Sequence, residues 1–192
     1  MAVEIELKAH IDDYAVLKER LSAVGEYCRS YKKSDSYWLP AQTAAPGVRV
    51  RRESGVDADG AAHESVLATY KIKEISGGME VNHECEFSVS DAGSFEEMLS
   101  RLGLHRAVCK EKEGWAWTVR SQNEGQPPIL AELSLVTHLG WFLEIEILAA
   151  DKSKQTVEES RGRLFTLLEK LEIPTDKIEE RPYTAMLAGV LT

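Results

Sequence analysis

The first strand-like segment of the chain alternates apolar and charged residues. In the peptide VEIELKAH, Glu4, Glu6 and Lys8 occupy every second position, and apolar residues stand between them. Because successive side chains of a strand point to opposite faces, an extended segment places these three charges on one face. Such a face would begin a binding site if it pointed into an enclosed space, and would only be solvated on an outer surface.

Further segments of the chain have the composition of strands. They cover residues 34–39, 47–53, 66–75, 82–91, 107–119, 127–137 and 140–150. The segments between them are rich in Pro, Gly and Asp, which is typical of turns, so the strands are predicted to pair as antiparallel hairpins. The peptide DADG is predicted to be one of these turns, because its glycine comes too early for an EF-hand calcium loop.

Apolar residues at helical spacing predict helices between and after the strands. The first covers residues 12–24, with Asp12 or Asp13 as its cap and Gly25 at its end. A second covers residues 94–103, where Ser94 and Glu97 have the spacing of a capping box. A long helix at 152–172 and a short one at 181–189 close the chain, which predicts an α+β fold.

Length, charge and cysteine content limit the class of protein. The chain has 192 residues, 43% of them hydrophobic, which fits a single domain over residues 1–192. It contains neither a long apolar run nor a basic and apolar leader, so we expect no membrane partner and a cytoplasmic location. A net charge of -9 argues against nucleic acid as a partner. Three widely spaced cysteines predict neither disulfides nor a zinc site.

The alternation of the first strand recurs in other strands. The pairs are Arg49 and Arg51, Lys71 and Lys73, Glu84 and Glu86, Lys110 and Lys112, and Glu144 and Glu146, and Glu132 stands on another strand. One interpretation is that these are the solvated sides of amphipathic strands. However, most of these strands carry one sign of charge, whereas a solubilising surface mixes signs. If about eight strands close into a barrel, its interior can hold a small ligand, and these charges would line it.

An ordered set of motifs connects these strands with a known family. EIELK, DSY, VRVRRE, TYKIK, HECEF, KEK, LGWFLEIEI and RPY resemble the CYTH superfamily of triphosphate tunnel metalloenzymes, which includes class IV adenylyl cyclases and thiamine triphosphatases. The resemblance extends from about Val3 to Leu187. It implies a closed antiparallel eight-stranded β-barrel with helices packed outside and charged side chains inside, and it implies a homodimer.

The resemblance also assigns roles to the charged residues. It implies that a triphosphate is held by Lys8, Arg49, Arg51, Lys71, Lys73, Lys110, Lys112 and Arg181. It implies that Mg²⁺ or Mn²⁺ is bound by Glu4, Glu6, Glu84, Glu86, Glu132, Glu144 and Glu146, and that Lys8, Glu6 and Glu144 are catalytic. This division is physically consistent, because a polyanion needs several positive donors and a hard divalent ion joins carboxylates to phosphate oxygens.

Some positions depart from the pattern of the family. Asn82 stands where the family usually has arginine. Lys112 replaces the arginine of the family's Lys-x-Arg motif. Ser134 stands where the family typically has an aspartate that acts at the metal. Glu132, two residues away on the same strand face, is the candidate to supply that carboxylate.

Three functions remain open from the sequence. The first is a metal-dependent cyclase that converts ATP to cyclic AMP and pyrophosphate, because TYK, LGLH and LGWFLEIEI resemble the class IV cyclase branch most. The second is a triphosphatase that releases orthophosphate from a nucleoside triphosphate, thiamine triphosphate or inorganic tripolyphosphate. The third is a non-catalytic barrel that binds an anion, which Asn82 and Ser134 favour.

Overall fold

The computed structural model describes residues 3–40, 47–76, 79–121, 123 and 125–190, and the side chains of residues 71–84 lie outside this description. The strands are β1 (Val3–Ile11), β2 (Glu26–Pro40), β3 (Val48–Asp57), β4 (Ala62–Ser76), β5 (Met79–Ser88), β6 (Leu104–Val119), β7 (Ile129–Val136) and β8 (Gly140–Ala149). The α-helices are α1 (Tyr14–Val24), α2 (Ala92–Arg101), α3 (Lys154–Lys170) and α4 (Tyr183–Val190), and a short 3-10 helix, η1, covers Thr175–Lys177. These elements confirm the α+β class.

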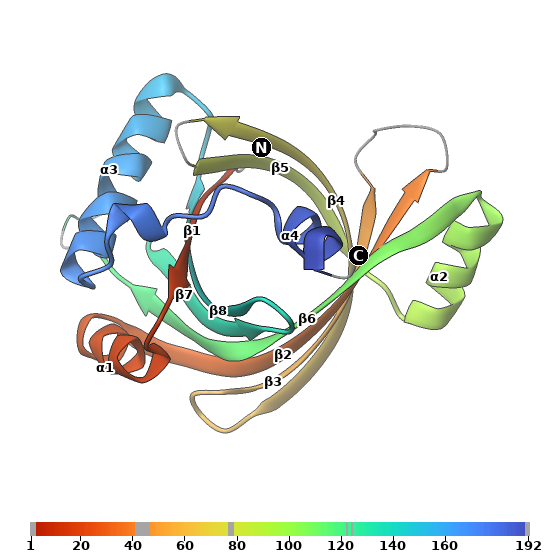
Figure 1. Cartoon of the computed structure of the whole chain (residues 1–192), viewed down its shortest axis with the longest axis horizontal. Coiled ribbons are helices and arrows are strands. Elements are labelled where there is room, and N and C mark those ends of the chain that lie inside the picture. The colour runs from red at the N-terminus through yellow and green to blue at the C-terminus, as the bar shows by residue number, and fades with distance from the viewer. Residues whose placement is uncertain (1–2, 41–46, 77–78, 122, 124, 191–192) are drawn as a thin grey trace.

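All eight strands are antiparallel to their neighbours. Their order is β1-β5-β4-β3-β2-β6-β7-β8, and β1 pairs with β5 on one side and with β8 on the other, so the sheet closes into a barrel (Figure 1). Nine residue pairs join β1 to β8, from Val3 opposite Ala149 to Ile11 opposite Trp141. This long pairing fixes the register of β1, and the register decides which of its side chains point inward.

The main apolar core lies outside the barrel, between the sheet and two helices. The alternate residues Ile5 and Leu7 of β1 are buried there together with Leu143 and Ile145 of β8. Helix α1 contributes Leu17 and Leu21, and α3 contributes Leu164, Leu167 and Leu168. Because apolar side chains fill the outer face of these strands, the charged residues between them are left for the inner face.

Two further helices cover other parts of the barrel. Helix α2 packs on the outside of β2 and β3, where Ala92 and Leu99 contact Trp38 and Val50. Helix α4 lies across the space that the strands encircle, as Figure 1 shows. Its residues Tyr183 and Met186 form a cluster with Val136 and Phe142. One side of the barrel interior is therefore closed by the carboxyl-terminal helix.

The ends of the first two helices test the predicted caps. Asp13 caps α1, since its carboxylate accepts hydrogen bonds from the backbone N–H groups of Ala15 and Val16, and α1 stops at Gly25 as predicted. The capping box predicted for the second helix is wrong. Asp91 is the cap, and its carboxylate accepts from the N–H of Ser94 at 2.6 Å.

Some strands are longer than their sequence patterns predicted. Strand β2 begins at Glu26 rather than at residue 34, and β6 begins at Leu104 rather than at residue 107. The DADG turn is confirmed, with Gly60 at a φ of +88°. Among the described residues, none of the helices has the length and apolar composition needed to cross a membrane.

Gly114 of β6 lies where the backbones of two strands come close. A methyl group at its Cα would meet the carbonyl oxygen of Leu133 at 2.1 Å. We expect Gly114→Ala to push β6 and β7 apart and to lower the free energy of unfolding by about 1–3 kcal/mol. Urea titration followed by circular dichroism measures this change.

Gly162 in α3 offers a matched control, because a methyl group there meets nothing within 4 Å. Gly162→Ala should raise the free energy of unfolding by about 0.5–1 kcal/mol, since glycine is unfavourable inside a helix. If Gly114→Ala were as stable as the wild-type protein, the close approach of the two strands would be refuted.

Candidate active site

A cavity of about 710 Å³ lies inside the barrel. Its lining includes most of the charged residues predicted from the sequence, namely Glu4, Glu6, Lys8, Arg49, Arg51, Glu86, Lys110, Lys112, Glu132, Glu144 and Glu146. They come from six of the eight strands, β1, β3, β5, β6, β7 and β8. The alternation seen in the sequence therefore brings distant parts of the chain to one enclosed space.

Three carboxylates converge on one side of this cavity. Glu4 and Glu6 come from β1, and Glu146 of β8 stands directly opposite Glu6. One carboxylate oxygen of each lies within 4.8 Å of the other two. Burial, with the nearby charges of Glu4 and Glu6, raises the pKa of Glu146 to about 8. We refer to these three residues as the acidic trio.

The acidic trio fits a hard divalent cation. Its donor set consists of carboxylate oxygens alone, which is the chemistry that Mg²⁺ and Mn²⁺ prefer. The raised pKa of Glu146 also favours a cation here, because it results from burial and from the negative charges of Glu4 and Glu6 nearby. A divalent ion would relieve this crowding and favour the ionised form of all three groups.

A second cluster centres on Asp35 of β2, which is 1% exposed. Arg51 of β3 donates from Nε and Nη2 to the two carboxylate oxygens at 2.7 and 2.9 Å. Lys110 of β6 lies 3.0 Å from Oδ2 of Asp35. Burial alone would raise the pKa of Asp35, but Lys110 and Arg51 hold it well below its usual range. Asp35 thus fixes two cations of the lining from the strand between them.

A third cluster runs through Lys33, Glu132, Lys112 and Glu144. Glu132 accepts from Lys33 Nζ at 2.5 Å and from Lys112 Nζ at 3.0 Å. Lys112 also donates to Glu144. Burial opposes ionisation of Glu144, yet the charges of Lys112 and Lys110 lower its pKa to about 2. This chain of alternating charges crosses from β2 to β8.

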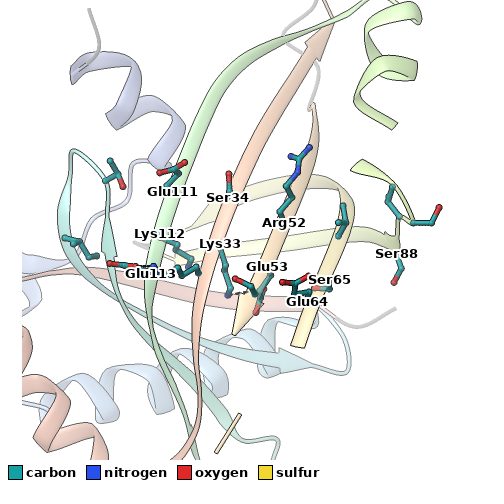
Figure 2. A pocket seen from close by; sticks show the side chains of 17 residues that line it. Lys33, Ser34, Arg52, Glu53, Glu64, Ser65, Ser88, Glu111, Lys112 and Glu113 are labelled. Carbon is teal, nitrogen blue, oxygen red and sulfur yellow. Dashed lines mark ion pairs between the residues drawn. The ribbon is translucent and has the colours of Figure 1, made fainter. Parts of the chain in front are cut away.

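Figure 2 shows part of this cluster. Lys112, Lys33 and Glu53 reach from the neighbouring strands β6, β2 and β3, and Lys33 Nζ lies 3.8 Å from a Glu53 oxygen. They border a second pocket of about 950 Å³, to which outward residues such as Ser34, Arg52 and Glu111 also contribute.

Other charged residues of the lining meet polar groups of neighbouring elements. Arg49 donates to Thr69 Oγ1 at 3.0 Å, and the Thr69 hydroxyl donates to Glu86 at 2.7 Å. Lys8 donates to the carbonyl oxygen of Arg181 at 2.6 Å. The ammonium groups of Lys8 and Lys110 lie 4.4 and 4.8 Å from the centre of the Tyr183 ring.

Some predicted site residues are not brought into this arrangement. The Arg181 side chain is 68% exposed and binds the carboxylate of Glu179, so only its backbone carbonyl reaches Lys8. Glu132 lies between two lysines and is separate from the acidic trio. Ser134 is fully buried on β7 opposite Gly114. Lys71, Lys73 and Glu84 lie on β4 and β5, and their side chains are outside the described part.

Strand β2 contributes strongly to the lining with residues that were not among the predicted site residues, although residues 34–39 were predicted to be extended. Arg29, Tyr31, Lys33, Asp35 and Tyr37 alternate along β2, and Arg29, Lys33 and Tyr37 line the cavity. The signal was the same period of two that identified the other strands. It was hidden because the residues between them, such as Ser30, Lys32 and Ser34, are polar as well.

Eight antiparallel strands enclose a cavity lined by both carboxylates and cationic side chains. The model of the CYTH domain matches residues 2–183, and the chain therefore belongs to the CYTH family. A comparison with curated protein sequences found no significant match.

Solved structures with the same fold come from several organisms. A protein from Pyrococcus horikoshii OT3 has a TM-score of 0.77 and 24% identity, with 97% of this chain and 98% of that chain covered. A candidate adenylate cyclase from Vibrio parahaemolyticus has a TM-score of 0.73 and 17% identity, with 96% and 97% covered. A candidate adenylyl cyclase from Hippeastrum, which has a dominant triphosphatase activity, has a TM-score of 0.64 and 17% identity, with 100% and 98% covered.

Asp35→Asn tests the cluster that holds Arg51 and Lys110. The variant keeps the shape but leaves two largely buried cations without a counter-charge, so the free energy of unfolding at neutral pH should fall by about 3 kcal/mol. The pKa of Asp35 is lowered in the folded state, so its contribution is complete above the ordinary value of 3.8 and is lost as pH falls toward the folded pKa. The difference between wild type and variant should therefore shrink in acid.

Urea titrations of both proteins from neutral to acidic pH measure this difference. Asp176→Asn, at an exposed position, is the control and should follow the wild-type protein throughout. A constant difference between wild type and Asp35→Asn across the pH range would show that the charge of Asp35 is not what stabilises the fold.

Proposed function

We propose that this protein is a divalent-metal-dependent enzyme that acts on ATP inside the barrel and forms cyclic AMP and pyrophosphate. The observation that carries the proposal is the single cavity in which the acidic trio faces cations from β2, β3 and β6. A triphosphate carries about four negative charges, and it needs such cations to replace the water it loses on entering. The whole chain, residues 1–192, would form one catalytic domain.

The residues of the lining divide into groups with different tasks. Glu4, Glu6 and Glu146 would hold Mg²⁺ or Mn²⁺, which supplies charge neutralisation and a polarised phosphate oxygen. Lys8, Arg49 and Lys110 would bind phosphate oxygens through their buried or half-buried cationic groups. Arg51 is oriented by Asp35 and can extend this row of cations.

Cyclisation requires one bond to form and one to break at the α-phosphorus. The ribose 3′-hydroxyl oxygen attacks the α-phosphorus, the bond to the bridging oxygen breaks, and pyrophosphate leaves as the hydroxyl proton is lost to solvent or a base. Lysine and arginine groups around the phosphates stabilise the charge that collects on the leaving oxygen. Lys8, Glu6 and Glu144 are the residues we assign to this centre.

The apolar part of the lining supports a substrate with an organic group. Tyr37, Leu39, Ala107, Val108 and Pro182 all border the same cavity. Apolar and aromatic side chains with a few charged anchors are typical of sites for a base or another organic group, whereas inorganic tripolyphosphate has nothing to place against them. This favours a nucleoside triphosphate over tripolyphosphate.

A triphosphatase is the second candidate. The chain is similar in fold to the Hippeastrum protein, for which a dominant triphosphatase activity is described. The same cations could serve attack by water on the terminal phosphorus, because the two reactions differ in which phosphorus meets the nucleophile.

Incubating the purified protein with ATP and Mg²⁺ or Mn²⁺ separates the candidates. We expect cyclic AMP and pyrophosphate, detected by chromatography and by a phosphate assay with and without pyrophosphatase. Orthophosphate and ADP instead would support the triphosphatase. A ligand at one hundred times its Kd stabilises the native state by about 2.7 kcal/mol, which is on the order of 5–10 °C in Tm here. If neither ATP nor tripolyphosphate raised Tm with metal present, both candidates would be wrong.

Glu6→Gln tests the acidic trio directly. The amide removes one charged ligand, so metal-dependent turnover should fall at least a hundredfold, on the order of 3 kcal/mol in transition-state stabilisation, while Tm changes little. Activity is measured at saturating Mn²⁺, and Mn²⁺ affinity by calorimetry. Glu113→Gln, the same change on the exposed outer face of β6, is the control. Wild-type activity in Glu6→Gln would remove the residue from the metal site.

A further inference from the structure

Tyr183, the first residue of α4, borders the cavity and contacts two lysines of its lining. The Nζ atoms of Lys8 and Lys110 lie 4.4 and 4.8 Å from the centre of its ring. Lys8 belongs to β1 and Lys110 to β6, and β7 and β8 separate these strands in the sheet. A ring from a helix outside the sheet therefore contacts cations from two strands that do not pair with each other.

The segment before α4 fixes the position of this ring along β1. The backbone N–H of Glu179 donates to the carbonyl oxygen of Lys8 at 2.8 Å. The Nζ of Lys8 in turn donates to the carbonyl oxygen of Arg181 at 2.6 Å. These two bonds hold the segment against β1, and they bring Tyr183, two residues after Arg181, next to the Lys8 side chain.

Apolar contacts also hold the ring. Phe142 of β8 meets it edge-on, with the ring centres 5.1 Å apart, and Met186 of α4 packs in the same cluster. Tyr183 is 7% exposed, and its hydroxyl is buried without a hydrogen-bond partner among the residues that the structure describes. The side-chain contacts described for Tyr183 are therefore made by the ring, and the hydroxyl adds no hydrogen bond to them.

We propose that Tyr183 is a positioning residue of the active site, whose ring holds the ammonium groups of Lys8 and Lys110 ready for one phosphate chain. The face of an aromatic ring attracts an ammonium group within about 6 Å of its centre, most strongly where water is excluded. Without the ring, the two ammonium groups would repel each other, and both flexible side chains would have to be ordered when the ligand binds. The inference rests on the proposed function in taking these two lysines as phosphate-binding groups.

This assignment makes the carboxyl-terminal helix part of the active site. The strands supply the charged groups, and α4 supplies an uncharged surface that orders two of them. Lys8 and Lys110 each have a further partner, the carbonyl oxygen of Arg181 and the carboxylate of Asp35. The ring adds a contact that is common to both lysines.

The test compares the affinity of variants for inorganic tripolyphosphate, measured by calorimetry without metal and then with Mg²⁺. Tyr183→Leu keeps an apolar side chain but removes the ring, so its affinity should fall about tenfold. Tyr183→Phe keeps the ring and loses only a hydroxyl that has no partner among the described residues, so it should bind as the wild type does. Loss of affinity in Tyr183→Phe would assign the effect to the hydroxyl and overturn the role of the ring.

Met186→Ala is the matched control for a loosened α4. It removes apolar contacts of the same helix and the same cluster, but it leaves the Tyr183 ring in place. It should lower Tm, because it opens a cavity beside Phe142, while the affinity for tripolyphosphate stays that of the wild type. An equal loss of affinity in Met186→Ala and Tyr183→Leu would show that Tyr183 acts only through the packing of α4, and would overturn the proposal.

Nuclear magnetic resonance tests the contact without any ligand. The ring current of an aromatic side chain shifts the resonances of protons that lie over its face. The Hε protons of Lys8 and Lys110 should be shifted upfield in the wild type and in Tyr183→Phe, and the shift should disappear in Tyr183→Leu. If Tyr183→Leu fails to fold, unshifted Hε protons in the wild-type protein would still overturn the proposal.

The outcomes separate this inference from the proposed function. If the wild type bound tripolyphosphate but did not turn over ATP, the proposed reaction would be wrong, and a tenfold weaker Tyr183→Leu would still support the role of the ring. Equal affinity in the wild type and folded Tyr183→Leu would overturn the role of the ring and leave the proposed reaction intact. A wild type that bound no tripolyphosphate under either condition would contradict the assignment of Lys8 and Lys110, and with it this inference.

Discussion

The structure depends on mutual compensation of charges that are removed from water. A buried unpaired charge is so costly that a barrel with this lining could not fold unless its ionic groups met one another or a ligand. Asp35 satisfies this requirement for Arg51 and Lys110, and Glu132 does so for Lys33 and Lys112. The acidic trio is the part of the described interior where negative charge accumulates, as the raised pKa of Glu146 indicates.

Helices α1 and α3 cover the outer, apolar face of the barrel strands. Leu17 and Leu21 of α1 and Leu164 of α3 fill the outer surface of β1 and β8, which leaves only the inner face for Glu6, Lys8 and Glu144. The hydrophobic core is thus displaced to the exterior of the barrel, and the centre is polar. This inversion is possible because antiparallel strands can present different chemistry on their two faces.

Local patterns in the sequence predicted the strands, the helices and most charged residues of the lining. The period of two placed Glu4, Arg49, Lys110 and Glu144 on one face, and Asp13 and Gly25 gave the ends of α1. The sequence could not show which cation meets which carboxylate, because this depends on the register between strands that are far apart in the chain. Lys33 was missed for a related reason: polar residues stand on both faces of β2 around it, with Ser30, Lys32 and Ser34 on one face, so no alternation of apolar and polar residues marked this part as extended.

The acidic trio has one more property that follows from its position. Glu4 and Glu6 belong to the first strand, Glu146 belongs to the last, and these two strands form the seam that completes the ring. Strand β1 can pair with β8 only after nearly the whole chain has been synthesised. An ion coordinated by the trio would bridge β1 and β8 and so hold the two ends of the sheet together. Metal would then favour ring closure as well as chemistry, and the same three carboxylates would couple assembly of the protein to the supply of its cofactor.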